Sequence, residues 1–272
     1  MNSTQKIIKI VAIGLAVMLI VNIFSGIFYA LSWVTDYFMK ETISEGTTTF
    51  KENYEEINEI DIEATTSNIV IQSGNKFTVE TKNLKSNFSS KVRNQILKIE
   101  EDNNWFQKKE ERGKIIITVP QNTKLNKLSI NTGAGKFEIN NIQVQEVELD
   151  HGTGDLEVYN STFYETDIDA GVGEIYIRNS TLNHVDLDAG VGKIDMEAKI
   201  TGTSQIECGI GSIELTLIGT DDDYTINTEK GIGSITINDQ EQKNNMTYGT
   251  GANILTLEGG IGSINVYFKP EE

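Results

Sequence analysis

The sequence predicts an all-β protein: a single-stranded β-solenoid of about eight rungs, or turns of the coil, preceded by one N-terminal transmembrane helix. Three observations support this prediction. Pairs of glycines one residue apart recur with a 19-residue period, as at positions 133, 152, 171, 190 and 209. The residues on both sides of each pair alternate between apolar and polar, which is typical of half-buried strands. An uncharged apolar stretch lies near the N-terminus.

The apolar stretch has no charged residue between positions 10 and 34. As a helix it is long enough to cross about 30 Å of hydrocarbon. Lys6 and Lys9 precede it, so the positive-inside tendency places the N-terminus in the cytoplasm. Residues 1–34 are therefore predicted to be the cytoplasmic N-terminus and anchor of a single-pass protein of the cell membrane, with its C-terminal domain extracellular. The alternative is a cleaved signal peptide, but the bulky Phe28 stands where cleavage requires a small residue.

The chain after the anchor divides into a linker and a repeat domain. Residues 35–56 have weak periodicity and many polar side chains, so we interpret them as a stalk. Residues 57–272 are the predicted extracellular solenoid. Within it, residues 73–121 depart from the repeat and are expected to form an irregular cap or insertion. The residues expected to close the open end of the core follow the last strand: Tyr267, Phe268 and Pro270.

The repeat is defined by the first glycine of each pair. These glycines are Gly133, Gly152, Gly171, Gly190, Gly209, Gly231 and Gly260; the first four intervals between them are equal, and the last two are longer. Apolar residues almost always stand five and three positions before this glycine and four and six positions after it. Each repeat is thus expected to contain two strands, with the glycine pair at a sharp turn between them. A dinucleotide-binding loop is excluded, since a third glycine and a following helix are missing.

Successive repeats are expected to pair in parallel, about 4.8 Å apart. The unit at residues 60–71 has apolar residues at the same positions of the repeat, and it is expected to be a terminal rung. The residue after the first glycine grows from Ala134 to Ile261. This trend predicts that it points inward and that the core widens along the rod. An up-and-down or sandwich arrangement of hairpins is the structural alternative.

The chain outside the predicted anchor is strongly acidic. The formal net charge is −17, whereas residues 1–40 carry +2. Nucleic acid and anionic lipid surfaces are therefore not expected as partners of this part. A charge-driven partner should be cationic, such as a divalent ion, a basic peptide or a basic protein face. The single Cys208 excludes an internal disulfide.

Acidic residues recur two positions before the first glycine of each pair, which we call the reference glycine, and we call this set of equivalent positions the acidic column. They alternate with the apolar residues of the same strand, so they are predicted to point outward. The acidic column consists of Glu63, Asp150, Asp169, Asp188, Glu207, Glu229 and Glu258, and Asn131 interrupts it. Stacked carboxylates repel one another. Two interpretations stay open: a solvated edge that prevents aggregation, or a ladder that binds a divalent cation or a cationic partner. The candidate metal ligands, with Ca²⁺ as the candidate ion, are Asp150, Asp169, Asp188, Glu207, Asp221, Asp222 and Asp223.

No catalytic or cofactor-binding residue is identified from the sequence. His151 shares a column with Ala170 and Cys208, so it is predicted to be a core or corner residue, and His184 is predicted in a turn. Neither histidine has neighbours at the spacing of a catalytic triad or a metal site. A carbohydrate-active surface enzyme on a β-solenoid is the alternative function, and it requires mixed acidic and basic groups at one place.

Four features together carry a resemblance: the N-terminal anchor, the unit IDIEATTSNIVI (60–71), a strand ending in TVP (118–120), and repeated D-x-G-x-G-x-I-x-I units. Over roughly residues 45–269 the chain resembles the bacterial putative-adhesin family of β-strand-repeat proteins, a domain of unknown function. Some members of that family are encoded beside cell-envelope stress-response systems, which implies a surface or regulatory role. The leading interpretation is a non-enzymatic, membrane-anchored surface module for partner binding, adhesion or envelope-stress sensing. Its expected partner is a cationic protein or another component of the cell envelope.

Overall fold

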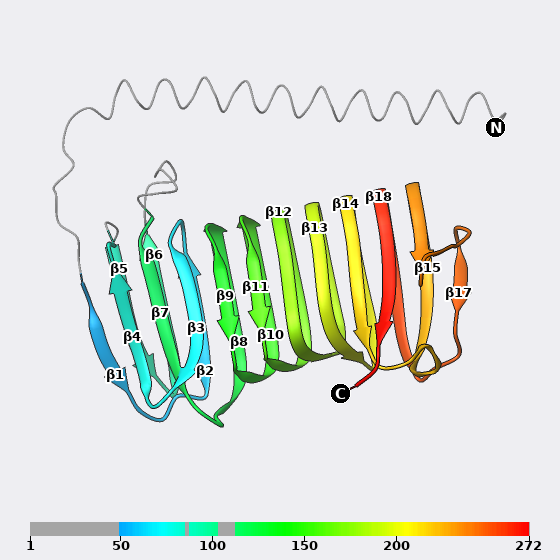
Figure 1. The fold of residues 1–272 in the computed structure, drawn as a ribbon. Coiled ribbons are helices and arrows are strands. Elements are labelled where there is room, and N and C mark those ends of the chain that lie inside the picture. The colour runs from blue at the N-terminus through cyan, green and yellow to red at the C-terminus, as the bar shows by residue number, and fades with distance from the viewer. Residues whose placement is uncertain (1–48, 85–86, 103–111, 272) are drawn as a thin grey trace, which may run out of the picture. The chain divides into compact units, whose positions relative to one another are not determined.

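The computed structural model describes residues 49–84, 87–102 and 112–271, and this part of the chain consists mainly of β-strands (Figure 1). The predicted anchor and most of the predicted stalk lie outside the described residues. No helix in the described part is long and apolar enough to cross a membrane.

The strands up to the first complete repeat are β1 (Lys51–Tyr54), β2 (Glu59–Ala64), β3 (Asn68–Gly74), β4 (Phe77–Lys82), β5 (Asn87–Arg93), β6 (Ile96–Asp102), β7 (Lys114–Pro120), β8 (Lys124–Ala134) and β9 (Phe137–Asn140). Those that follow are β10 (Gln143–Thr153), β11 (Leu156–Tyr159), β12 (Thr162–Asn183), β13 (Val185–Thr201), β14 (Thr203–Ile218), β15 (Tyr224–Ile237), β16 (Gln240–Glu241), β17 (Met246–Tyr248) and β18 (Asn253–Lys269). A short 3₁₀ helix, η2 (Asp221–Asp223), precedes β15.

The repeats stack as parallel rungs, so the up-and-down or sandwich arrangement of hairpins is wrong. Leu149 of β10 pairs with Ile130 of β8 on one side and with Ile168 of β12 on the other. The same parallel register continues from β12 to β13 and from β13 to β14. Each rung therefore receives backbone hydrogen bonds from the rungs on both sides, which a 19-residue period makes possible because equivalent residues face each other.

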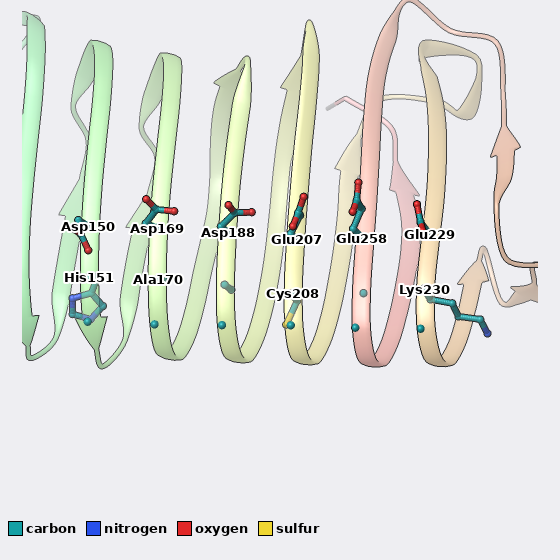
Figure 2. A pocket seen from close by; sticks show the side chains of 18 residues that line it. Asp150, His151, Asp169, Ala170, Asp188, Glu207, Cys208, Glu229, Lys230 and Glu258 are labelled. Carbon is teal, nitrogen blue, oxygen red and sulfur yellow. The ribbon is translucent and has the colours of Figure 1, made fainter. Parts of the chain in front are cut away.

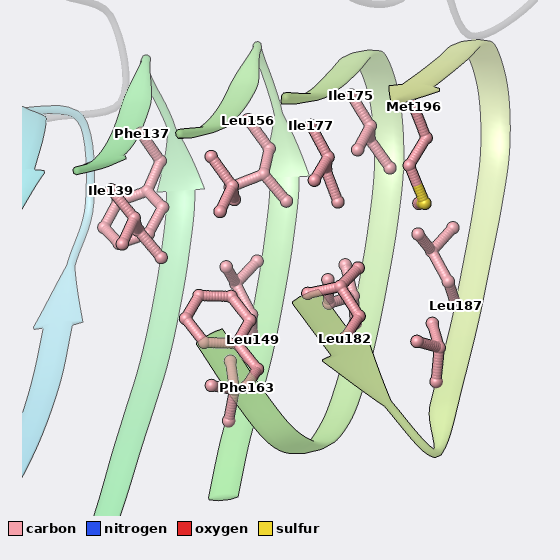
Figure 3. Close-up of a cluster of buried hydrophobic side chains, with 14 of the residues drawn as sticks. Phe137, Ile139, Leu149, Leu156, Phe163, Ile175, Ile177, Leu182, Leu187 and Met196 are labelled. Carbon is pink, nitrogen blue, oxygen red and sulfur yellow. The ribbon is translucent and has the colours of Figure 1, made fainter. Parts of the chain in front are cut away.

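The core is the interior of the coil (Figure 3). Leu149 and Leu187 point inward from the first strand of their rungs, and Phe137, Leu156 and Ile175 point inward from the second. The apolar columns on both sides of the glycine pairs are buried, as their period of two predicts. Each such side chain contributes about 1.5–3 kcal/mol to folding, and stacking supplies every column with the same partners above and below.

Each regular rung turns at two kinds of corner. At the first, the second glycine of the pair has a φ that only glycine adopts readily, for example +150° at Gly192. At the second, an asparagine adopts the left-handed conformation, with φ between +49° and +55° at Asn141, Asn160 and Asn179. The asparagine corner was not predicted, although these asparagines recur with the same period as the glycines.

The residue between the two glycines points outward, so the prediction that it fills a widening core is wrong. Val172 is 51% exposed and Ile261 is 48% exposed. The alternation of a strand would place this residue inside, but the chain reverses direction at the glycine pair. The side chain at the corner is consequently left on the convex, outer surface.

The C-terminal rungs do not stack in the order of the sequence. Strand β18 lies between β14 and β15, so β15 is the last rung of this end. Strands β16 and β17 pair antiparallel with the exposed edge of β15 and partly cover it. Tyr267 and Phe268 therefore lie in an internal rung and Pro270 directly follows it, so the prediction that they close the open end is wrong. The ring of Phe268 packs beside Tyr224 and Tyr248.

The N-terminal rungs are rearranged in the same way. Strand β2 lies between β6 and β8, and β3 pairs with both β7 and β9. The unit at residues 60–71 is thus not the terminal rung, because β6 and β7 form a further rung beyond it. Strands β4 and β5 pair antiparallel with that outer rung. Strand β1, at the end of the segment interpreted as a stalk, pairs with β4 and belongs to the sheet.

Candidate binding groove

Six carboxylates stand in a row on consecutive rungs (Figure 2). We call this row the acidic ladder. In spatial order it consists of Asp150, Asp169, Asp188, Glu207, Glu258 and Glu229. The last two are reversed relative to the sequence, because β18 lies inside β15. Beyond Asn131, which pairs with Asp150, the column continues with Glu63 and Glu100.

The acidic ladder lines a groove of about 690 Å³ that crosses these rungs. The other residues of the groove are the reference glycines and the corner residues between them and the carboxylates (Figure 2). Most of those corner residues are small, such as Ala170, Ala189 and Cys208. The groove is therefore a shallow channel with carboxylates along it and little side-chain bulk at its base.

A second acidic column runs beside the ladder on the same outer face. Its carboxylates are Glu148, Asp167 and Asp186, which pair with one another across β10, β12 and β13. Sequence reasoning missed this column, although the triplets ELD, DID and DLD at residues 148–150, 167–169 and 186–188 show both columns together. The face around the ladder thus carries two carboxylates on each of three consecutive rungs.

Burial and the neighbouring negative charges both raise the pKa of two ladder carboxylates. Burial raises the pKa of Asp188, and the nearby Glu207 and Asp186 raise it further. Burial likewise raises the pKa of Glu258, together with the charges of Glu207 and Glu229. Each shift means that the ionised form is less stable in the folded chain than in water. A cation placed in the groove would relieve this repulsion.

Charges on the second strands of the same rungs are arranged differently, because they are paired. Nζ of Lys193 lies 3.0 Å from Asp195 and 2.6 Å from Glu214, and Arg178 binds Asp195 at 2.7 Å. These carboxylates raise the pKa of Lys193. By contrast, none of the ion pairs formed within the described residues involves a member of the acidic ladder. The ladder, like Asp167 and Asp186 beside it, therefore has no ion-pair partner among the described residues.

The candidate metal ligands do not converge in the structure. In residues 49–84, 87–102 and 112–271, no group of three or more His, Cys, Asp or Glu side chains is arranged to hold a metal ion. Residues Asp221–Asp223 form η2, where Asp223 accepts hydrogen bonds from the backbone N–H and the hydroxyl of Thr220. Asp223 thus caps a turn, and the calcium site stays a prediction from sequence.

The histidines have structural surroundings. His151 is buried at the glycine corner, and its Nδ1 lies 2.6 Å from Oγ1 of Thr132 on the adjacent rung. Its burial confirms the prediction that His151 is a core or corner residue, and the same burial lowers the pKa of its ring. His184 is exposed in a turn with φ +48°. Cys208 is buried, and its burial raises the pKa of the thiol, so it is a poor nucleophile.

Comparison with known proteins identifies the repeat. The family model described as Toastrack DUF4097 matches residues 57–251. Among curated proteins, none matches the chain significantly.

Solved structures similar to the chain come from several bacteria. A putative cell adhesion protein from Clostridium sporogenes is 15% identical, with 82% of this chain and 100% of that chain covered and a TM-score of 0.35. A putative adhesin from Bacteroides fragilis is 15% identical, with 82% and 98% covered and a TM-score of 0.44. A putative lipid binding protein from Parabacteroides distasonis is 17% identical, with 82% and 97% covered and a TM-score of 0.34. Because these TM-scores are below 0.5, we draw no functional conclusion from them.

Proposed function

The chain belongs to the Toastrack DUF4097 family, and from this premise we propose that it is a non-enzymatic binding module of the cell surface. In this proposal residues 1–34 anchor it in the membrane, and the acidic groove binds a cationic partner of the cell envelope. Adhesion or envelope-stress sensing would then depend on what occupies the groove.

One observation carries the proposal: the acidic ladder is continuous over six rungs and has no basic side chain paired with it in the described residues. Like charges directly opposite each other cost about 0.2–1 kcal/mol per pair. The second strands of the same rungs avoid that cost with lysine and arginine. A cationic partner in the groove would neutralise the ladder carboxylates, as lysine and arginine neutralise carboxylates on the second strands.

The groove lining favours binding over catalysis. A carbohydrate-active enzyme requires basic and aromatic groups beside its carboxylates. The residues that line the groove include one lysine, Lys230, and no phenylalanine, tyrosine or tryptophan. The histidine of the groove, His151, is buried against Thr132. No observation in the described residues favours the enzyme.

Binding at the groove can be tested with a simple cationic probe. The full chain in nanodiscs of zwitterionic lipid is titrated with fluorescent oligolysine at several salt concentrations. We expect Asp169→Asn/Asp188→Asn to weaken binding and to flatten its salt dependence, since two charges are removed from the groove. The matched control is Glu52→Gln/Glu55→Gln, which removes two exposed charges in and just after β1. Equal binding by the parent and both variants would contradict the proposal.

The membrane orientation needs its own experiment. Protease is added to intact cells that produce the full chain with a tag at each end. We expect loss of the C-terminal tag and survival of a short fragment with the N-terminal tag, as the positive-inside tendency predicts. A C-terminal tag that stays intact until the membrane is permeabilised would reverse the orientation and exclude a surface role.

A further inference from the structure

An exposed apolar row runs beside the acidic ladder. We call it the apolar ridge, and in spatial order it consists of Val172, Val191, Ile210, Ile261 and Ile232. These side chains are between 39% and 51% exposed. Five rungs about 4.8 Å apart give the ridge a length of about 19 Å. Single exposed apolar residues are ordinary, but a contiguous row of them marks an interaction surface.

The ridge lies directly beside the groove because of the residue spacing within each rung. Each ridge residue directly follows a glycine that lines the groove, and the ladder carboxylate stands three positions before the ridge residue, as in Asp169 and Val172. This relation holds on five consecutive rungs, from Asp169 to Glu229. A partner lying along the groove would meet carboxylates on one side and apolar side chains on the other.

We propose that the ridge and the groove together bind an amphipathic, cationic peptide segment that lies along the stack of rungs. This inference rests on the proposed function and specifies its partner. Charge complementarity selects this occupant, since lysine or arginine on the segment would face the uncompensated ladder while its apolar residues cover the ridge. A second copy of this chain or an anionic lipid surface would bring negative charge against the same carboxylates.

The spacing suits a helical segment. An α-helix rises about 5.4 Å per turn, close to the rung separation of about 4.8 Å, so one residue per turn stays nearly in step with one rung over the ridge. About 13 residues span about 19 Å at a rise of about 1.5 Å per residue. The small residues Ala170, Ala189 and Cys208 leave room for the segment between the two rows.

Two synthetic peptides with the same number of lysines, and therefore with equal charge, test the proposal, and the longer of them is long enough as a helix to cover the ridge. One is a Leu/Lys helix with a continuous apolar face, and the other is oligolysine. The full chain in zwitterionic nanodiscs is titrated with each, and binding to empty nanodiscs is subtracted. We expect Val191→Ser/Ile210→Ser to weaken the amphipathic peptide about tenfold and to leave oligolysine unchanged, because only apolar contacts are lost. Ile261→Ser on a later rung should act in the same direction.

The matched control is Ile254→Ser, which removes an isoleucine of similar exposure, 40%, outside the ridge. It should bind both peptides like the parent. If the ridge variants bind the amphipathic peptide like the parent while Asp169→Asn/Asp188→Asn weakens both peptides, the ridge inference is wrong and the proposed function stands. If the ladder variant weakens neither peptide, the proposed function itself is wrong. If light scattering shows a dimer of the parent that the ridge variants abolish, the ridge contacts a second copy and the inference is overturned.

Discussion

Replacement of a single corner glycine should show how much the close stacking of rungs contributes to the free energy of unfolding, apart from ordinary core packing. Gly262 in β18 has φ +148°, a conformation that is essentially restricted to glycine. A Cβ on this residue would overlap the carbonyl oxygen of Gly211 on the adjacent rung and lie 2.7 Å from its carbonyl carbon. The two glycines are register partners. Because both obstacles are backbone, no side-chain rotation can relieve the overlap.

The expected cost of Gly262→Ala has two parts. The unfavourable backbone conformation costs about 1–3 kcal/mol. The displacement of the neighbouring rung costs about 1–3 kcal/mol more, as in other overpacked sites. A total of about 4 kcal/mol would lower the melting temperature of a domain of this size by about 8–16 °C.

The control is Gly259→Ala in the same strand. A Cβ there would meet only side-chain atoms of Ile264, at 3.3 and 3.4 Å, and Ala189 and Cys208 occupy the same column on neighbouring rungs. We expect a change below about 1 kcal/mol. Thermal and urea unfolding of the full chain in detergent, followed by circular dichroism, measures both variants. Similar losses in the two variants, or a loss below about 1 kcal/mol for Gly262→Ala, would refute the stacked-corner geometry.

Three further predictions concern charge, protonation and the ridge. Asp188→Asn should raise the free energy of unfolding by about 0.5 kcal/mol because ladder repulsion falls, whereas Asp195→Asn in the same strand should lower it by up to about 1 kcal/mol because ion pairs are lost. Burial lowers the pKa of His151, so only the unfolded chain gains its proton as the pH falls below about 6.5. Stability should therefore fall over this range in the parent relative to His151→Ala. Ile210→Asp should cost less than about 1 kcal/mol, and Ile213→Asp, which buries a charge, more than about 4 kcal/mol.

Urea unfolding measures all three, at pH 7 for the substitutions and between pH 7 and 5.5 for the histidine. Destabilisation by Asp188→Asn would mean that the ladder is not a source of repulsion. In the histidine series, the carboxylates with raised pKa also affect stability. Their protonation at lower pH stabilises the folded state, but it does so equally in the parent and in His151→Ala. Identical pH profiles would thus show that His151 does not stay neutral. Equal losses for the two isoleucine variants would place the ridge inside the core.

Features of this protein that are local or periodic could be predicted from the sequence alone. The 19-residue period fixed which residues face each other across rungs, because parallel stacking aligns equivalent positions. The period of two inside each strand fixed which columns are buried, as for Leu149, and which are outside, as for Asp150. The acidic ladder could be predicted from these two periods without knowledge of the turns between strands.

Features that depend on chain direction and on pairing between distant segments required the folded structure. Val172 lies outside because the chain reverses at the glycine corner, where strand parity no longer applies. Strand β18 lies between β14 and β15, and the other edge of β15 is paired with β16 and β17 instead of a further parallel rung. Neither the direction of a corner side chain nor the order of rungs is encoded by periodicity, since every repeat offers the same pairing pattern. The ridge beside the ladder, and with it the proposed partner, therefore emerged only from the folded chain.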